Sequence, residues 1–86
     1  MKAKIERKGK AKAIDLAFRV RILNNINIVT IHKKIDNPYY WAYINDRLIC
    51  VFFVDAFNNA HLTTKSISED KNNLVLNCFS EIRDII

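Results

Sequence analysis

Two histidines are the side chains of this 86-residue sequence whose ordinary pKa suits proton transfer near neutral pH. His32 and His61, together with a lysine, could act as general base, general acid and phosphate stabiliser in a metal-independent ribonuclease. They are 29 residues apart, in different expected strands, and nothing in their spacing brings them together. We therefore expect no catalytic residues and no enzyme activity, and a ribonuclease remains a minor alternative.

Few other residues could act as a nucleophile, bind a metal or form a phosphate-binding loop. Cys50 lies in an apolar segment and Cys78 on an apolar helical stripe, so both are expected to be small buried hydrophobes. Two cysteines alone cannot supply a four-ligand zinc site, and the single Gly9 cannot build a phosphate-binding loop. We expect neither a metal nor another cofactor.

The most informative signal is the uneven distribution of charge. Residues 1–34 carry ten Lys and Arg against two acids, whereas residues 35–86 carry four against seven. A basic first third is typical of a partner that is a polyanion, most often nucleic acid. The alternative is a solvated surface that keeps the protein soluble. The candidate nucleic-acid-binding residues are Lys8, Lys10, Lys12, Arg19, Arg21, His32, Lys33 and Lys34.

Length and composition indicate one globular domain, residues 1–86, because half of the residues are hydrophobic and Gly and Pro occur once each. No apolar run approaches the ~20 residues of a membrane helix, and the N-terminus lacks the apolar stretch of a signal peptide. These features predict a cytoplasmic protein with reduced thiols and no membrane association. The abundance of Ile, Lys and Asn is typical of AT-rich genomes, including those of large lytic phages.

The elements that must position these residues are mainly strands. Residues 14–22 alternate apolar and polar side chains, as a half-buried strand does, whereas a helix would scatter Asp15 and Arg19 around an apolar cylinder. Asparagine-rich pairs punctuate the following sequence, and Asn tolerates the positive φ of tight turns. The remaining expected strands cover residues 26–35, 39–44, 47–57 and, more weakly, 60–65.

A change to helical spacing follows the last strand. Apolar residues from Leu74 to Ile86 form one stripe of a helix over residues 68–85, with Ser68 as its N-cap. Strands followed by one helix predict an α+β fold: an antiparallel β-meander of four to five strands with the C-terminal helix packed on one face. Residues 1–12 are expected to be a basic arm or an edge extension.

The first hairpin predicts a basic sheet face. With Asn24-Asn25 as a two-residue turn, Leu23 pairs with Ile26, Phe18 with Ile31 and Arg19 with Thr30. One face is then apolar, although a slip of one residue would exchange the faces. An ordinary solvated face is the alternative to a binding surface. The opposite face collects Arg19, Arg21, His32 and Lys34.

Four aromatic residues follow this hairpin. In a strand, Tyr39, Trp41 and Tyr43 share one face, and Tyr40 takes the other. A two-residue turn at Asn45-Asp46 would place Trp41 opposite Cys50 and Tyr43 opposite Leu48. The aromatic side chains could stack on bases, fill the core or form an interface.

The segment 47–57 is apolar on both of its faces, whereas one helix can cover only one side of a sheet. A second copy of the chain would cover the other side, so we expect a homodimer. The alternative is that the strand curls and that the arm or the 36–40 loop covers it.

These observations favour a small, non-catalytic nucleic-acid-binding protein. RNA is favoured over duplex DNA because the one helix has an acid-containing exposed face unsuited to the major groove, whereas a basic sheet face with nearby aromatic residues suits RNA. The alternative is a protein-interaction module: an inhibitor or adaptor, such as a phage-type counter-defence protein acting on a host protein.

Overall fold

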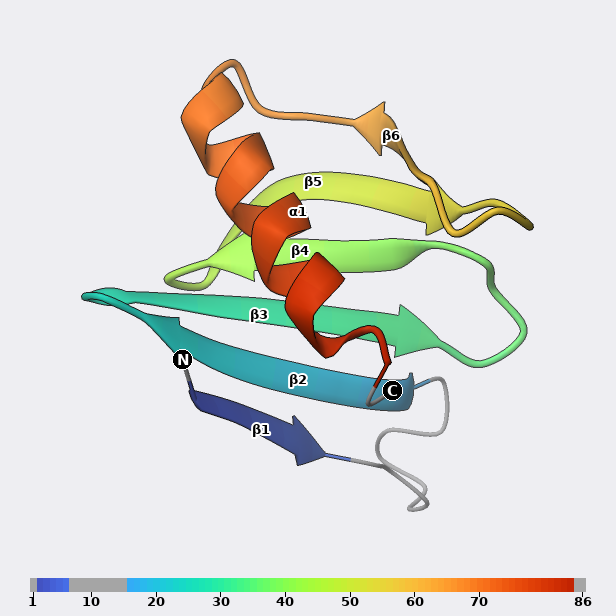
Figure 1. The fold of residues 1–86 in the computed structure, drawn as a ribbon, viewed down its shortest axis with the longest axis horizontal. Helices are drawn as coiled ribbons and strands as arrows, with labels where there is room; N and C mark the ends of the chain where they lie inside the picture. Colours follow the sequence, from blue (N-terminus) through green and yellow to red (C-terminus); the bar gives the residue numbers. More distant parts are fainter. Residues whose placement is uncertain (1, 7–15, 85–86) are drawn as a thin grey trace.

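A computed structural model of the chain describes residues 2–6, by their backbone, and residues 16–84. Six strands form one antiparallel sheet in which chain order is also spatial order, and one helix follows them (Figure 1). This arrangement confirms the α+β meander with a C-terminal helix. The elements are β1 (Lys2–Glu6), β2 (Leu16–Asn24), β3 (Asn27–Lys34), β4 (Tyr40–Ile44), β5 (Arg47–Val54), β6 (Ala60–Thr64) and α1 (Glu69–Ile82).

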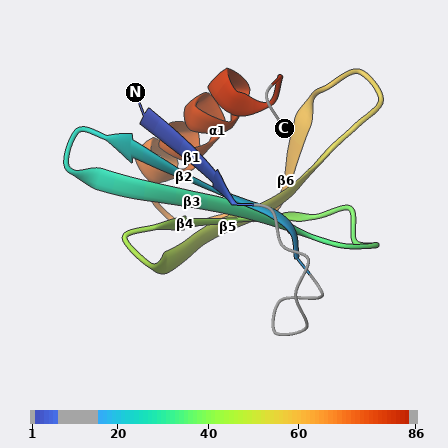
Figure 2. The same cartoon turned by 90° about the horizontal axis from the view of Figure 1, so that it is seen from below.

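The helix α1 lies on one side of the sheet (Figure 2), where it crosses β3, β4 and β5 (Figure 1). Its apolar stripe, Val75, Cys78, Phe79 and Ile82, is buried against the sheet. The sheet contributes the inward-facing residues of each strand because successive strand residues point to opposite faces. Those buried residues include Val20, Ile22, Val29, Ile31, Ala42 and Phe52.

Three aromatic rings form the centre of this core. Phe79 contacts Tyr40 at 4.9 Å and Phe52 at 5.0 Å between ring centroids, both edge to face, and Tyr40 stacks on Phe52 at 5.1 Å. Edge-to-face and offset-stacked pairs are favourable beyond the area that they bury. Burial raises the pKa of Tyr40 above its usual value. Tyr40 is therefore a core residue rather than part of a binding surface.

Local signals at the helix ends agree with the sequence. Ser68 is the N-cap, and its hydroxyl accepts a hydrogen bond from the backbone N–H of Lys71 at 3.3 Å. Glu69 and Asp70 occupy the first turn, where negative charge is favourable. At the other end, the Arg83 guanidinium donates to the Asn58 carbonyl at 2.9 Å and so connects the helix to the β5–β6 turn.

Asn and Asp residues make the tight turns, as the sequence predicts. Positive φ occurs at Asn25, Asp36, Asn45, Asp46 and Asn58. Asn45 and Asp46 both have positive φ, as a type I′ hairpin requires. The Asn45 side chain also accepts from the backbone N–H of Ile28 at 2.9 Å, which joins this turn to β3.

The register of the first hairpin differs from the prediction. The turn residues are Asn25 and Ile26, so that Asn24 pairs with Asn27 and Leu23 with Ile28 instead of Ile26. From Phe18 onwards each β2 residue therefore faces a partner two positions later than expected, which leaves these side chains on their predicted face. A bulge between Leu16 and Phe18 makes Leu16 the exception, because it pairs with Lys34, one position later than expected. Phe18 pairs with Lys33 rather than Ile31, and Arg19 with His32 rather than Thr30.

The second hairpin contains an irregularity that changes one predicted pair. Tyr43 pairs with Leu48 as expected, but Trp41 pairs with Val51 instead of Cys50 because Ile49 is an extra residue in β5. Such a bulge turns consecutive residues to the same side. Ile49 and Cys50 accordingly both belong to the core cluster.

Strand β5 lies next to the edge strand β6, and its residues 49–52 are all buried within a single chain. It ends at Val54 rather than at residue 57 because Asp55 begins the turn into β6. The exposed apolar side chains on the face opposite α1 are Leu23, Ile28 and Leu48, which lie towards one end of the sheet. Homodimerisation stays a prediction. A dimer would have to bury these three exposed side chains.

The N-terminal segment is an edge extension over residues 2–6, which pair with β2 as β1, from Lys2 opposite Leu23 to Glu6 opposite Arg19. This strand was not counted among the four to five that the sequence predicts. Its sequence, KAKIE, alternates charged and apolar residues, which is a strand pattern, but the segment is only five residues long. The remainder of the predicted arm, residues 7–12, lies outside the described residues.

We predict that Phe79→Ala lowers the free energy of unfolding by about 3–5 kcal/mol because it removes the ring that joins α1 to Tyr40 and Phe52. Urea unfolding monitored by circular dichroism measures this change. Phe57→Ala is the matched control, because the Phe57 side chain is 84% exposed and the same truncation there should cost less than about 0.5 kcal/mol. Equal losses for the two variants would mean that α1 is not anchored by Phe79.

Candidate nucleic-acid interface

The face of the sheet opposite α1, here called the open face, carries polar and aromatic side chains on β2, β3 and β4. Because paired residues lie side by side across neighbouring strands, the register arranges them in two rows. In the first row Arg19 pairs with His32, and His32 pairs with Trp41. In the second row Arg21 pairs with Thr30, and Thr30 pairs with Tyr43. Each row runs from an arginine through a polar residue to an aromatic ring.

These rows enclose a shallow pocket of about 240 Å³. A mostly open pocket of this size can hold one small polar group or one unit of a polymer, rather than enclose a whole ligand. Its walls combine two arginines, one acid, hydrogen-bonding groups and the rings of His32 and Tyr43. The lining residues are Arg19, Arg21, Thr30, His32, Tyr43 and Asp46.

Ring contacts order the middle of the open face. The His32 imidazole lies 5.4 Å from the Tyr43 ring, centroid to centroid, in a tilted arrangement. The Lys34 ammonium lies 5.3 Å from the centre of the Trp41 ring, within the range of a cation–π contact. The Trp41 indole N–H is buried without a hydrogen-bond partner within the described part of the chain. A buried indole N–H usually has a hydrogen-bond partner, so the Trp41 N–H is an exception within this part of the chain.

The charge of the pocket is positive. Arg19 is half-buried beside the exposed Arg21. Asp46 is the one acid that lines the pocket among residues 16–84, and it enters from the β4–β5 turn rather than from β2. The arginine side of the pocket is therefore the side that attracts anions.

The other predicted contact residues are divided between the two faces. Lys34 belongs to the open face with Trp41, whereas Lys33 pairs with Phe18 and Tyr40 and so lies on the face of β3 that α1 covers. Lys8, Lys10 and Lys12 lie outside the described residues.

The four aromatic residues are divided in the same way. Trp41 and Tyr43 lie on the open face, and Tyr40 is in the core. Tyr39 precedes β4 and contacts the Phe53 ring at 6.1 Å. Phe53 in turn stacks on His61 at 5.1 Å. This second group extends the aromatic surface towards β6 and was not expected from the sequence.

The two histidines are too far apart to act together on one phosphate group. His32 is on β3 and His61 on β6, three strand spacings or about 14 Å across the sheet. A general acid and a general base that act on one phosphate must both be within hydrogen-bonding reach of it. The pairing of His32 and His61 that a ribonuclease would need is therefore not present in this arrangement.

Both cysteines are buried free thiols, as the sequence predicts. Burial raises the pKa of Cys50 to about 11, and burial is also the largest cause of the raised pKa of Cys78. Because the thiolate is the reactive form, neither side chain is a suitable nucleophile at neutral pH. Cys78 accepts a weak hydrogen bond from the Asn24 side chain at 3.8 Å.

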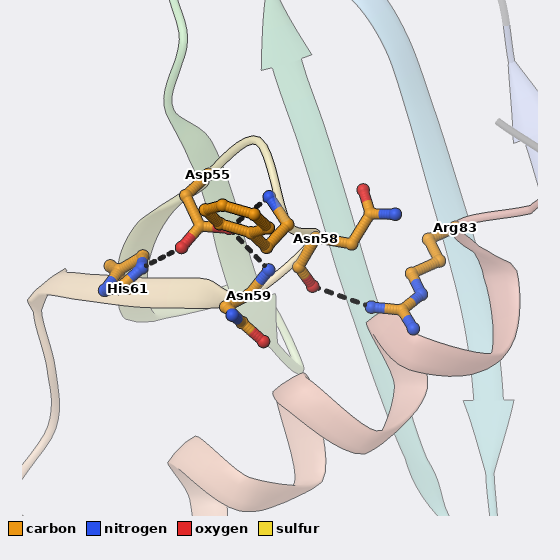
Figure 3. A network of polar contacts seen from close by, with 6 residues as sticks. Asp55, Asn58, Asn59, His61 and Arg83 are labelled. Atoms are coloured by element: carbon orange, nitrogen blue, oxygen red, sulfur yellow. Dashed lines mark hydrogen bonds and ion pairs between the residues drawn. The ribbon is translucent and has the colours of Figure 1, made fainter.

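A separate polar network holds the β5–β6 turn (Figure 3). One Asp55 oxygen accepts from the backbone N–H groups of Phe57 at 2.8 Å and Asn59 at 3.0 Å, and the other lies 2.8 Å from the His61 ring nitrogen. The hydrogen bond to His61 is the largest cause that lowers the pKa of Asp55, to about 2. This network is a structural element of the turn, because its main-chain bonds define the loop conformation.

We predict that Asp55→Asn changes the pH dependence of stability. The pKa of Asp55 is lower in the folded protein than its ordinary value of about 3.9, so the ionised carboxylate stabilises the fold. This contribution is complete above about pH 4 and is lost as the pH falls through about 2.

The measurement is thermal unfolding at pH 7 and at pH 2. Asp55→Asn should melt below the parent at pH 7, and the difference should shrink towards pH 2. Glu81→Gln, on an exposed residue of the last turn of α1, is the control for removing a carboxylate. A constant difference between parent and Asp55→Asn over this range would contradict the role assigned to the ionised group.

Comparison with known proteins provides no assignment: no family model, no curated protein and no solved structure matches this chain. Across residues 2–6 and 16–84, no helix is long and apolar enough to cross a membrane. Within the same ranges, His, Cys, Asp and Glu side chains form no group of three that could hold a metal ion.

Proposed function

We propose that this protein binds RNA through the open face, without catalysing a reaction. The observation that carries this proposal is the pocket in which Arg19, Arg21 and His32 surround a position next to the Tyr43 ring. Arginine side chains bind phosphate oxygens, and an aromatic ring can stack on an unpaired base. We place this activity in the cytoplasm, as the sequence suggests.

The architecture supports a single-stranded or irregular RNA rather than duplex DNA. The binding groups lie on a sheet surface, and α1 presents Glu69, Asp70 and Glu81 to solvent on the other side of the molecule. An acid-bearing helix is repelled by the phosphates of a major groove. A sheet face with exposed rings instead accommodates bases that are not paired with a second strand.

Charge reversal provides the test. Arg19→Glu combined with Arg21→Glu should abolish most RNA binding, because both residues line the pocket. In the parent protein, affinity should fall steeply with salt because phosphate contacts release counterions. Replacement of Arg19 alone with Gln should reduce the slope of log affinity against log salt concentration by about 1. Fluorescence anisotropy of a labelled oligonucleotide measures both quantities.

Lys65→Glu combined with Lys71→Glu is the matched control, since it makes the same change of net charge. Both lysines are exposed, and neither lines the open-face pocket. This double variant should lose much less affinity than the arginine double variant. If both double variants bind RNA as the parent does, the open face is not an RNA-binding surface, and the positive charge serves solubility.

A protein-interaction module is the second candidate function. It is favoured by one observation, the exposed apolar side chains of the Leu23–Ile28 pair and of Leu48 towards one end of the open face. Clustered apolar side chains on a surface can mark a contact with another protein, including a second copy of the same chain. An inhibitor or adaptor acting on a host protein would use this end of the face, and loss of RNA binding in the test above would leave it as the leading candidate.

A further inference from the structure

We infer that the open-face pocket seats one ribonucleotide in a fixed orientation, and that Thr30 and His32 distinguish ribose from deoxyribose. In this orientation the phosphate lies at Arg19 and Arg21, the sugar lies over β3, and the base lies against Tyr43. The inference rests on the proposed RNA binding and adds the part of the nucleotide that each strand contacts.

The order of side chains across the sheet supports this orientation. Both rows place an arginine on β2, a hydrogen-bonding side chain on β3 and an aromatic ring on β4. A nucleotide has the same order of chemical groups: an anionic phosphate, a sugar with hydroxyl groups and a flat base. Strands β2 and β4 are two spacings or about 9.6 Å apart, which suits a nucleotide laid across the strands.

The charged residues that line the pocket determine which end of the nucleotide lies at the arginines. Arg19 and Arg21 are two residues apart on one strand, so their Cα atoms are separated by about 6.7 Å and both guanidinium groups can approach one phosphate or two consecutive ones. Asp46 enters the pocket from the β4–β5 turn and repels a phosphate placed at that end. The reverse orientation would put the phosphate near this carboxylate and the base near two arginines.

The middle of the pocket is where the sugar lies. Thr30 is half-buried between Arg21 and Tyr43, and its hydroxyl makes no hydrogen bond within the described ranges of the chain. The neighbouring His32 is also half-buried and contacts Tyr43. A hydroxyl and an imidazole can each donate or accept a hydrogen bond. They can therefore bind the ribose 2′-hydroxyl, which deoxyribose lacks and which allows proteins to tell RNA from DNA.

The test compares oligouridine with oligodeoxyuridine, each about ten nucleotides long, so that the two ligands differ in the 2′-hydroxyl. Trp41 is the single tryptophan of the chain and lies beside His32 in the first row, so its intrinsic fluorescence reports binding at this face. The parent should bind the RNA about three- to tenfold more tightly than the DNA at the same salt concentration.

Two variants locate the source of that preference. Thr30→Val keeps the shape of the side chain and removes the hydroxyl, and His32→Phe keeps a ring beside Tyr43 and removes both nitrogens. In each variant the ratio of RNA to DNA affinity should move towards 1, mainly because RNA binds less tightly. Thr64→Val is the matched control on β6, three strands away from β3, and should keep the parent's ratio. Thermal unfolding of each variant verifies that it is folded.

The outcomes separate this inference from the proposed function. Equal binding of RNA and DNA that still depends on Arg19 and Arg21 would overturn the ribose assignment and leave nucleic-acid binding intact. A preference for RNA that survives both Thr30→Val and His32→Phe would also overturn it. No binding of either oligonucleotide would overturn the proposed function and, with it, the inference.

Discussion

A single helix covers only one face of this sheet, and most other features of the molecule follow from that constraint. The helix α1 has 14 residues, or about 21 Å of length, and it crosses β3 to β5 on one side. The apolar side chains of the sheet must therefore point to that side to be buried. Side chains at the alternate positions point to the open face, where polar and aromatic groups gather without disturbing the core.

The strand β4 illustrates this division. Tyr40 and Ala42 face α1, and Tyr40 joins Phe52 and Phe79 in the aromatic centre of the core. Trp41 and Tyr43, at alternate positions, lie on the opposite face beside Lys34 and His32. The packing that anchors the helix thus also fixes the direction of the rings that we propose contact RNA. A change that loosened the core at Tyr40 would move the proposed binding surface as well.

The fold could be predicted because its signals are local. Alternation in β2, Asn-rich turns, and the stripe and Ser68 cap of α1 each specify one element. The register of the first hairpin could not be predicted in the same way. A turn at Asn24-Asn25 and one at Asn25-Ile26 place every side chain on the same face, so the apolar pattern cannot distinguish them.

The candidate site could be predicted only in part. Arg19, Arg21, His32 and Lys34 were expected to share a face because alternation assigns them to it. Other features depend on distant pairing: Lys33 falls on the helix side, and Asp46 reaches the pocket from a turn. The stacking of Phe53 on His61 likewise depends on how β6 pairs with β5. Because several strands contribute residues to the pocket, no sequence pattern within a single strand predicts it.

The central claim is that ligand contact occurs on the open face and not on α1. The most direct measurement is the change in methyl NMR signals as oligouridine is added to the protein. The signal of Thr30, in the open-face pocket, should shift as the RNA binds, whereas that of Leu76, a partly exposed residue of α1, should change little. Shifts concentrated in α1, with the Thr30 signal unchanged, would contradict the account.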